Sequence, residues 1–516
     1  MKTKYKLLSL LVSLNFILRI PSIPHEYYSD SFQIHILANS ISEFGHAKWW
    51  VNPLAMAGKY PYSEVSAYPF ILSGISQTTT IDVEMVILIF SIFLGIITAF
   101  AAYSLAGSIW NNSIFKLLVA FIFSTSPALL NYLTWTATGR APFIGLLPIF
   151  LLCLIKIRDD LRFLFLSIPL FILLFYTHSL VYFLIPVSLG YLISIISYKL
   201  INRFRLPGWV IVSSLLLCFM GLLSIPYITG HFLEDQSYYG GVKSFFLSSI
   251  PRYSGIMAIF MVPGLGYLLL KPNKMFKEWS LLLIFISITP FLLIENYMKW
   301  FIPIFVSLIA GIGLTNMLNS AKERKHVIAI LTTFLVLSVV FSGFFQHWRI
   351  GGEGITPFSE YMKESTYYSG LWMKDNMDSD STLICNKRAE GLELFAVSKV
   401  PTFVGIDSIC QAYGFFDVRE LKLEERSITS DDFWYSGPYE LSTSDETEIH
   451  RRWVFSDDFK DYESDYKERL GLTHVVEFNN IRGKYIWHGT RDSRFLDHVH
   501  TTNLVYNSNK MSIWNI

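Results

Sequence analysis

Long apolar runs fill the first 345 residues and constrain this chain more than any other feature. About 20 residues of helix cross the hydrocarbon core of a bilayer. Eleven runs reach or approach that length: 6–22, 84–107, 115–131, 141–156, 162–176, 179–198, 208–228, 254–270, 279–294, 300–317 and 326–346. The sequence therefore predicts a polytopic α-helical membrane protein with about eleven transmembrane helices.

The composition divides the chain into two parts. Of its 516 residues, 52% are hydrophobic and 16% are charged, whereas a soluble protein carries about 25% charged residues. The range 346–516 holds 28 acidic and 19 basic residues, and the range 1–345 holds 13 acidic and 23 basic residues. We expect a transmembrane domain at 1–346, with a long first outer loop at 23–83, and an extracytoplasmic soluble domain at 347–516.

The distribution of Lys and Arg predicts the orientation, because short cytoplasmic loops collect these residues. With a cytoplasmic N-terminus, the inner segments hold 16 Lys and Arg and the outer loops hold six. An odd number of spans then places the tail outside the cell membrane of a prokaryote, with archaea as one such source. The basic start and first apolar run also resemble a cleaved signal peptide, but no small-x-small cleavage site follows "LRIPSIPHEYY", which favours a retained span.

Sequence motifs exclude several function classes. The chain has no zinc-type spacing, P-loop or dinucleotide-binding glycine pattern, and we expect no nucleic-acid partner. Ionisable residues are nearly absent from the middle of the spans, which argues against a coupled transporter. Cys385 and Cys410 share the external tail, where a disulfide is one option. Two cysteines do not determine their own geometry, so the pairing stays open.

The stretch "HEYYSDSFQIHILANSISEFGHAKWW" follows the first span and holds the acid Asp30. Apolar residues between Ser31 and Phe44 are spaced as in a helix lying at the membrane interface, and Gly45 is a natural stop. Asp30 with Gln33 three residues later resembles a capping box, so one interpretation is that Asp30 only caps this helix. The other is that it takes part in chemistry.

Four segments, among them "SAYPFILSGISQTTTIDVEMV" before the second span, resemble the GT-C superfamily of glycosyltransferases, in particular the catalytic subunits of oligosaccharyltransferases. "EYYSDSFQIHILANSISEFGHAKWW" is similar to the start of their first outer loop, where an Asp precedes an amphipathic helix. "MKWFIPIFVSLIAGIGL" resembles a late span, and "YYSGLWMKDNMDSDSTLICNKRAEGLELFAVSKVPTFVG" resembles the start of their external domain. The resemblance implies a GT-C-like membrane domain and transfer of a sugar from a polyprenyl (dolichyl) phosphate.

The sequence also departs from that family. Oligosaccharyltransferase subunits carry an Asp-x-Asp or Asp-x-Glu pair in the second outer loop, but here the loop reads "NYLTWTATGRAPF". "CNKRAEG" stands where they carry a Trp-Trp-Asp acceptor motif. Use of a divalent metal, Mg²⁺ or Mn²⁺, and glycosylation of protein Asn are both in question. Transfer of a single sugar from a polyprenyl-phosphate donor fits these two loops better than transfer of an oligosaccharide to Asn.

Such a reaction needs few groups, because a polyprenyl phosphate leaves already ionised. One carboxylate that takes the proton of the acceptor hydroxyl, with cations facing the phosphate, is sufficient. Asp30 is the candidate general base, and Arg140, Arg252 and Lys299 are candidate ligands of the lipid phosphate. For each cation the alternative is an interfacial residue that reaches lipid headgroups.

Further candidates lie on the outer rim and in the tail. His178 in "FYTHSLVYF" either hydrogen-bonds substrate or is satisfied by neighbouring backbone. Glu26, Glu64 and Tyr68 are accessory candidates for shaping a pocket. The tail contains strand-like pieces such as "STLICN", "LTHVVEFN" and "KYIWHG", which predict an α/β or α+β domain. The acid- and aromatic-rich segments within 431–440 and 457–470 are candidates for binding sugars or a protein acceptor, against an ordinary solvated surface.

The sequence thus predicts an inverting glycosyltransferase of the cell envelope. Its partners would be the bilayer, a polyprenyl-phosphate-linked sugar and a glycan, lipid or protein acceptor. Two alternatives remain. One is a flippase or exporter of lipid-linked oligosaccharides, and the other is a catalytically degenerate GT-C-like protein of cell-surface assembly, which the missing acids of the second loop favour.

Overall fold

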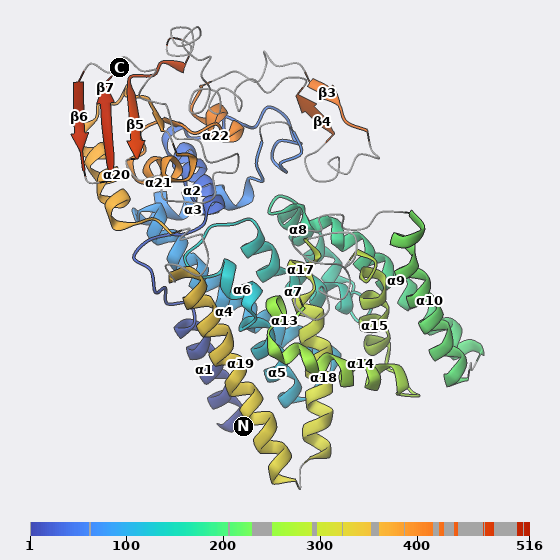
Figure 1. The fold of residues 1–516 in the computed structure, drawn as a ribbon. Coiled ribbons are helices and arrows are strands. Elements are labelled where there is room, and N and C mark those ends of the chain that lie inside the picture. The colour runs from blue at the N-terminus through green and yellow to red at the C-terminus, as the bar shows by residue number, and fades with distance from the viewer. Residues whose placement is uncertain are drawn as a thin grey trace. The chain divides into compact units, whose positions relative to one another are not determined.

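The computed structural model describes the chain in two compact units. It describes all residues except 1, 61–62, 205–206, 230–249, 292–296, 322–323, 352–360, 386, 416–422, 428–437, 442–467, 469, 479–502, 509 and 516. The first unit comprises Met1–Ile20, Ser91–Thr134 and Arg140–His347, and the second comprises Pro21–Phe90, Trp135–Gly139 and Trp348–Ile516 (Figure 1). The domain boundary expected near residue 346 stays a prediction. In this division by residue contacts, the expected first outer loop, 23–83, falls in the same unit as the tail.

Helices build the first unit. They are α1 (Lys2–Ile17), most of α4 (Val83–Ile109), α5 (Ser113–Ser124), α6 (Pro127–Tyr132), α7 (Arg140–Lys156), α8 (Arg162–Phe175), η1 (Ser179–Phe183), α9 (Leu184–Phe204), α10 (Gly208–Thr229), α13 (Ile250–Ser254), η3 (Ile256–Phe260), α14 (Met261–Leu270), α15 (Phe276–Ile288), α17 (Met298–Phe301), α18 (Pro303–Ser320) and α19 (Lys325–Gly351).

Each of the eleven predicted apolar runs overlaps one or more of these helices. Among the described residues, four helical stretches are long and apolar enough to cross a membrane: Val83–Ile109, Ser179–Phe204, Pro303–Ser320 and Lys325–Gly343. The run 115–131 is broken, because α5 ends at Ser124 and α6 restarts with Pro127, whose ring suits the first turn of a helix. The predicted total of about eleven spans stays a prediction.

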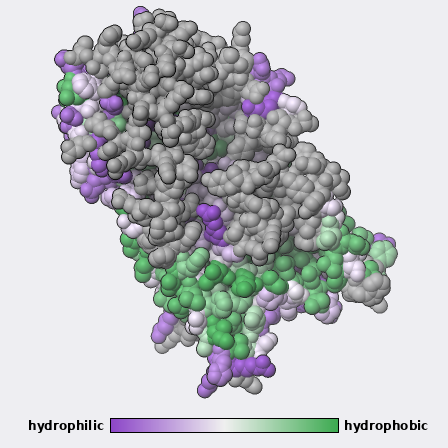
Figure 2. All heavy atoms as spheres, viewed as in Figure 1, coloured by the Kyte–Doolittle hydropathy of each residue, from purple (hydrophilic) through white to green (hydrophobic). Residues whose placement is uncertain are grey.

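Apolar side chains also cover outward faces of the first unit, where Figure 2 shows them gathered in green. In α8, Phe165 is 75% exposed and Leu166 is 58% exposed, and in α9 Ile196 is 59% exposed. Val336 and Val340 of α19 are exposed in the same way. Helices that are apolar both inside and outside are typical of proteins whose solvent is lipid.

Glycines allow α18 to pack closely against its neighbours in the first unit. A Cβ atom at Gly264 in α14 would overlap the carbonyl of Ile309, and one at Gly313 in α18 would overlap the carbonyl of Phe260. In lipid, helices gain association energy mainly from close packing, which small residues permit. The small-residue stretch of the run 300–317 therefore serves the contact between α18, α14 and η3.

The second unit combines helices with a mixed sheet. Its helices are α2 (Ser29–Phe44), α3 (Ala67–Thr79), α20 (Glu364–Asn376), α21 (Arg388–Ser398) and α22 (Asp407–Ala412). Its strands are β1 (Leu383–Cys385), β2 (Thr402–Phe403), β3 (Leu423–Glu425), β4 (Tyr439–Leu441), β5 (His474–Phe478), β6 (Asn503–Asn507) and β7 (Met511–Asn515). The main sheet has the order β2-β1-β5-β7-β6, with α20 and α21 beside it in Figure 1.

The strands of this sheet run in both directions. β1 pairs in parallel with β2 and β5, whereas β7 pairs antiparallel with β5 and β6. β1 and β5 coincide with the strand-like pieces "STLICN" and "LTHVVEFN". The piece "KYIWHG" and most of the segments 431–440 and 457–470 lie outside the described residues. All four cysteines are described, and none forms a disulfide; Cys385 and Cys410 are both buried.

Helix α2 lies in the core of the second unit, and its expected place at the membrane interface stays a prediction. Residues 31–41 are all buried except Gln33, and α2 packs against α3, α21 and α22. Its polar residues are buried too: Asn39 donates its side-chain N–H to the carbonyl of Ala396 in α21 at 3.0 Å. Gly45 does end the helix, with φ 75° and its N–H on the carbonyl of Ile41.

Candidate functional site

Four residues that the sequence singled out lie in the first unit, each at the end of a helix or in a short helix. Arg140 is the first residue of α7, Arg252 lies in α13, Lys299 lies in α17 and His178 directly precedes η1. Arg252 is exposed and the other three are half-buried. All four residues thus lie at the start of a helix or in a helix of four or five residues, and not in the middle of a long apolar helix.

Aromatic rings contact each of these side chains. The Arg140 guanidinium lies 5.4 Å from the ring centres of both Tyr132 and Tyr297, and Nη1 of Arg140 donates to the Tyr132 hydroxyl at 3.4 Å. The His178 ring lies 6.0 Å from the ring of Tyr297. A guanidinium between two rings is attracted by both π faces, which holds it in one orientation.

The other two cations contact the same group of rings. Nζ of Lys299 lies 5.5 Å from the ring of Tyr253 and 5.2 Å from that of Trp300, and the guanidinium of Arg252 lies 5.8 Å from Tyr253. Edge-to-face contacts join the rings, with 4.5 Å between Tyr253 and Trp300 and 4.7 Å between Trp300 and Tyr132.

These eight residues form one cation–aromatic cluster. Its members are Arg140, His178, Arg252, Lys299, Tyr132, Tyr253, Tyr297 and Trp300. Three positive charges so gathered favour a bound anion, and guanidinium and ammonium groups are the usual ligands of phosphate. Nothing in the sequence spacing joins the four aromatic members, which come from α6, α13 and the region around α17. The sequence analysis did not select them.

His178 is satisfied by neighbouring backbone, as one of its two interpretations expected. Its Nδ1 accepts the N–H of Leu180 at 3.0 Å and so caps η1. The proton of a neutral imidazole must then be on Nε2, because Nδ1 is the acceptor. This hydrogen bond determines the tautomer of His178, so Nε2–H is the nitrogen that can donate a hydrogen bond to another group.

Asp30, in the second unit, is not the cap of α2, so the predicted capping box is wrong. The helix begins at Ser29, the residue before it is Tyr28, and no side chain caps it. Asp30 is half-buried in the first turn, where a negative charge is favoured by the helix dipole. Asp30 is therefore not an N-cap of α2. Its expected role as a general base stays a prediction.

The three accessory candidates also lie in the second unit. Glu26 is fully buried, and its Oε2 lies 2.8 Å from Nδ1 of His35 in α2. Tyr68 is fully buried in α3, 5.6 Å from the ring of Phe90. Glu64 is half-buried in the preceding loop. The pairing with His35 gives Glu26 a place in the packing, and a role for any of the three in a substrate pocket stays a prediction.

Metal-binding side chains do not gather in the described residues. No group of three or more His, Cys, Asp or Glu in this part of the chain is close enough to hold a metal ion. Thr134 and Thr136 flank Trp135 and Thr138 follows, and a hydroxyl is a poor substitute for a carboxylate ligand. The donor set of the described residues does not fit Mg²⁺ or Mn²⁺, the divalent metals that the sequence left open.

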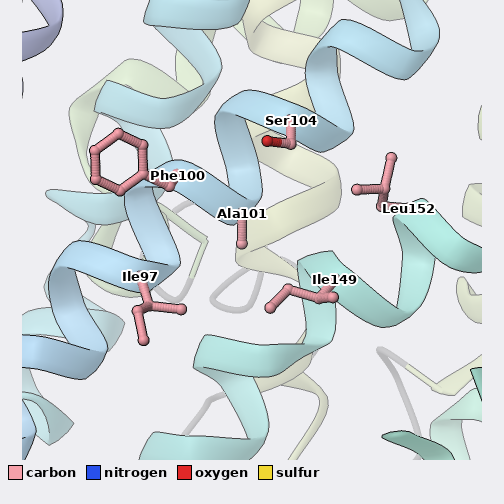
Figure 3. A pocket seen from close by; sticks show the side chains of 6 residues that line it. All are labelled: Ile97, Phe100, Ala101, Ser104, Ile149 and Leu152. Carbon is pink, nitrogen blue, oxygen red and sulfur yellow. The ribbon is translucent and has the colours of Figure 1, made fainter. Parts of the chain in front are cut away.

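The first unit also has a pocket that none of the cation–aromatic cluster residues lines. It measures about 260 Å³ and is lined by Ile97, Phe100, Ala101, Ser104, Ile149 and Leu152 (Figure 3). These residues come from α4 and α7 and, apart from the Ser104 hydroxyl, present only carbon atoms. The pocket can hold hydrocarbon but offers no group for catalysis.

Glu393 in α21 is a buried acid, and it predicts how stability depends on pH. Burial raises the pKa of its carboxyl well above the usual value, Glu390 adds to the rise, and Lys363 opposes it. Since the folded-state pKa exceeds the unfolded one, stability is highest below the unfolded pKa of about 4.3 and falls as the pH rises toward the folded pKa. Glu393→Gln removes the cost of burying a charge, so we expect a higher melting temperature than in the parent protein.

The measurement is thermal unfolding of both proteins in detergent between pH 5 and pH 8. The advantage of Glu393→Gln should grow as the pH rises. Glu364→Gln is the matched control, because Glu364 is an exposed acid in the first turn of α20 of the same unit. Parallel melting curves for Glu393→Gln and the parent protein at all pH values would contradict the prediction.

No protein-family model and no curated protein sequence matches the chain. The fold is similar to that of the oligosaccharyltransferase of Archaeoglobus fulgidus in the apo form, with a TM-score of 0.58 and 12% identity over 92% of this chain and 69% of that one. The same enzyme in complex with Zn and sulfate has a TM-score of 0.57 and 12% identity, over 92% of this chain and 68% of that one.

A further similar structure is the arabinofuranosyltransferase AftD from Mycobacteria. Its TM-score is 0.50 at 12% identity, and the match covers 98% of this chain but 39% of AftD. At such identities a likeness shows the fold alone. Together with the long apolar helices, it makes this chain a multi-pass membrane protein with the fold of the GT-C membrane glycosyltransferases.

Proposed function

We propose that this protein is a glycosyltransferase that moves one sugar from a polyprenyl-phosphate donor to an acceptor hydroxyl on the outer face of the membrane. The cation–aromatic cluster is the observation that carries the proposal. It gathers Arg140, Lys299, Arg252 and His178, which the sequence selected one by one, around shared rings. The GT-C fold and the sulfate in a structure of the A. fulgidus enzyme support binding of a phosphate group.

In the proposed reaction the Asp30 carboxylate takes the proton of the acceptor hydroxyl. The acceptor oxygen forms a bond to the anomeric carbon as the bond from that carbon to the phosphate oxygen breaks, which inverts the configuration. The polyprenyl phosphate leaves with the bonding electrons. Arg140 and Lys299 stabilise the negative charge that it gains, His178 donates from Nε2–H, and Arg252 adds positive charge at the exposed edge.

No step of this reaction passes through a metal ion. The A. fulgidus enzyme has been seen in complex with Zn, and in the part of this chain that the structure describes no three His, Cys, Asp or Glu side chains lie close enough to hold a metal ion. A phosphate leaving group needs charge neutralisation, and cationic side chains supply it in place of a metal.

The test is turnover of lipid-linked sugar by the purified protein. A polyprenyl-phosphate hexose with a labelled sugar is supplied in nanodiscs together with soluble glycoside acceptors, and free polyprenyl phosphate and labelled product are measured. We expect both to appear in equal amounts. Movement of a fluorescent lipid-linked sugar across liposomes without any release of polyprenyl phosphate would instead indicate a flippase. Absence of both activities would overturn the proposal in favour of an assembly protein.

A further inference from the structure

The turn that begins α2 is tied to a distant segment of the second unit. Ser31, one residue after Asp30, is fully buried, and its Oγ accepts the backbone N–H of Ala137 at 2.5 Å. This N–H lies within Trp135–Gly139, the segment directly before Arg140 in the sequence. A buried backbone N–H needs an acceptor, so the Ser31 hydroxyl holds the segment in place.

Trp135 is hydrogen-bonded to the same turn through its backbone and to the start of α4 through its side chain. Its carbonyl accepts the N–H of Tyr27 at 3.4 Å, and its indole N–H donates to the carbonyl of Glu84 at 3.1 Å. The Glu84 side chain in turn accepts the backbone N–H of Glu26 at 3.3 Å through Oε1. The residues before Asp30 are thus bound both to Trp135 and to the start of α4.

Two bulky residues in this arrangement adopt left-handed backbone conformations. Tyr28 has φ 84° and Trp135 has φ 51°, a region that costs a non-glycine residue free energy and is kept only where the surroundings impose it. The hydrogen bonds to Tyr27 and Ser31 flank Tyr28 in sequence. The strain is therefore concentrated where the chain turns into Asp30.

We propose that Ser31 and Trp135 are positioning residues, which hold the turn carrying Asp30 in the geometry that proton transfer requires. This inference rests on the proposed role of Asp30 as the general base. Neither residue supplies chemistry: Ser31 acts through the backbone of Ala137, and Trp135 acts through Tyr27 and Glu84. Displacing a reacting group by 1 Å costs roughly 100-fold in rate, and a loosened turn should cost part of that.

The experiment compares substitutions in the transfer assay with the full-length protein in nanodiscs. Ser31→Ala removes the acceptor of the Ala137 N–H and should lower kcat about tenfold, less than a full 1 Å displacement would cost, with the KM for the donor unchanged. Ser31→Thr keeps the hydroxyl and should restore most of kcat. Ser40→Ala is the matched control, because Ser40 is buried in the same helix and bonds only to the Leu37 carbonyl at 2.8 Å.

The outcomes separate this inference from the proposed function. A parent-like kcat for Ser31→Ala, a raised donor KM with unchanged kcat, or an equal loss in Ser40→Ala would overturn the positioning role. If Ser31→Ala does not fold, Trp135→Phe decides, since it removes the indole N–H and keeps an aromatic ring, and a parent-like kcat there would also overturn it. Asp30→Asn is measured alongside. If Asp30→Asn transfers sugar normally, the base assignment fails; if it is inactive while Ser31→Ala is normal, only the positioning role fails.

Discussion

Asp30→Asn should lower the rate of sugar transfer about 100- to 10,000-fold, the usual cost of removing a general acid–base group. An amide cannot take the proton of the acceptor hydroxyl at neutral pH. The substitution keeps the size of the side chain and a hydrogen-bonding oxygen, and it weakens the attraction between a carboxylate and the first turn of α2 by about 0.3–1 kcal/mol. The variant should therefore fold and insert, and transfer rates in membranes with matched protein levels measure the effect.

Glu43→Gln is the matched control for this substitution. Glu43 lies in the last turn of α2, is exposed, and carries the same change from acid to amide on the same helix. Its transfer rate should stay near that of the parent protein. Near-normal transfer by Asp30→Asn would remove Asp30 from the reaction and leave it as a favourable charge at a helix start.

Arg140→Gln should lower kcat/KM for the donor roughly 10- to 150-fold. A charge-assisted hydrogen bond contributes about 1.5–3 kcal/mol, and each 1.4 kcal/mol corresponds to about tenfold. The structure predicts a smaller loss for Arg140→Lys, which keeps the charge between Tyr132 and Tyr297 but lacks the planar guanidinium. Initial rates at varied donor concentration measure both variants.

Arg158→Gln is the control for Arg140→Gln. Arg158 also contacts an aromatic ring, with its guanidinium 3.9 Å from Phe276, but that ring belongs to α15 and not to the cation–aromatic cluster. Donor kinetics should be unchanged in this variant. Unchanged kinetics in Arg140→Gln as well would assign Arg140 to lipid headgroups, the alternative that the sequence left open.

The start and end of α2 show which features of a helix can be predicted from neighbouring residues alone. The pattern from Ser31 to Phe44 predicted a helix with a stop at Gly45, and the structure has the helix from Ser29 to Phe44. Helix periodicity and the left-handed preference of glycine are local properties, so they can be read from a short stretch. The predicted capping box failed because Asp and Gln three residues apart suit the first turn as well as the cap.

The surroundings of α2 could not be predicted in the same way. Asn39 in α2 is buried, and its side-chain N–H donates to the carbonyl of Ala396, 357 residues away. The cation–aromatic cluster is similar: charge and position near span ends selected Arg140 and Lys299, whereas Tyr132, Tyr253 and Tyr297 carry no local mark that separates them from the other tyrosines.

The sequence by itself determined that this chain has long apolar helices, an acidic tail with strands and a set of ionisable residues near the ends of its apolar runs. These follow from hydropathy and periodicity, which neighbouring residues set together. Tertiary structure alone decided that α2 is buried, that Ser31 holds the N–H of Ala137, and that the rings of Tyr132, Tyr253, Tyr297 and Trp300 join the cations. The physical reason is that partners brought together by packing, from different helices and at irregular separations along the chain, leave no periodic or spacing signal in the sequence.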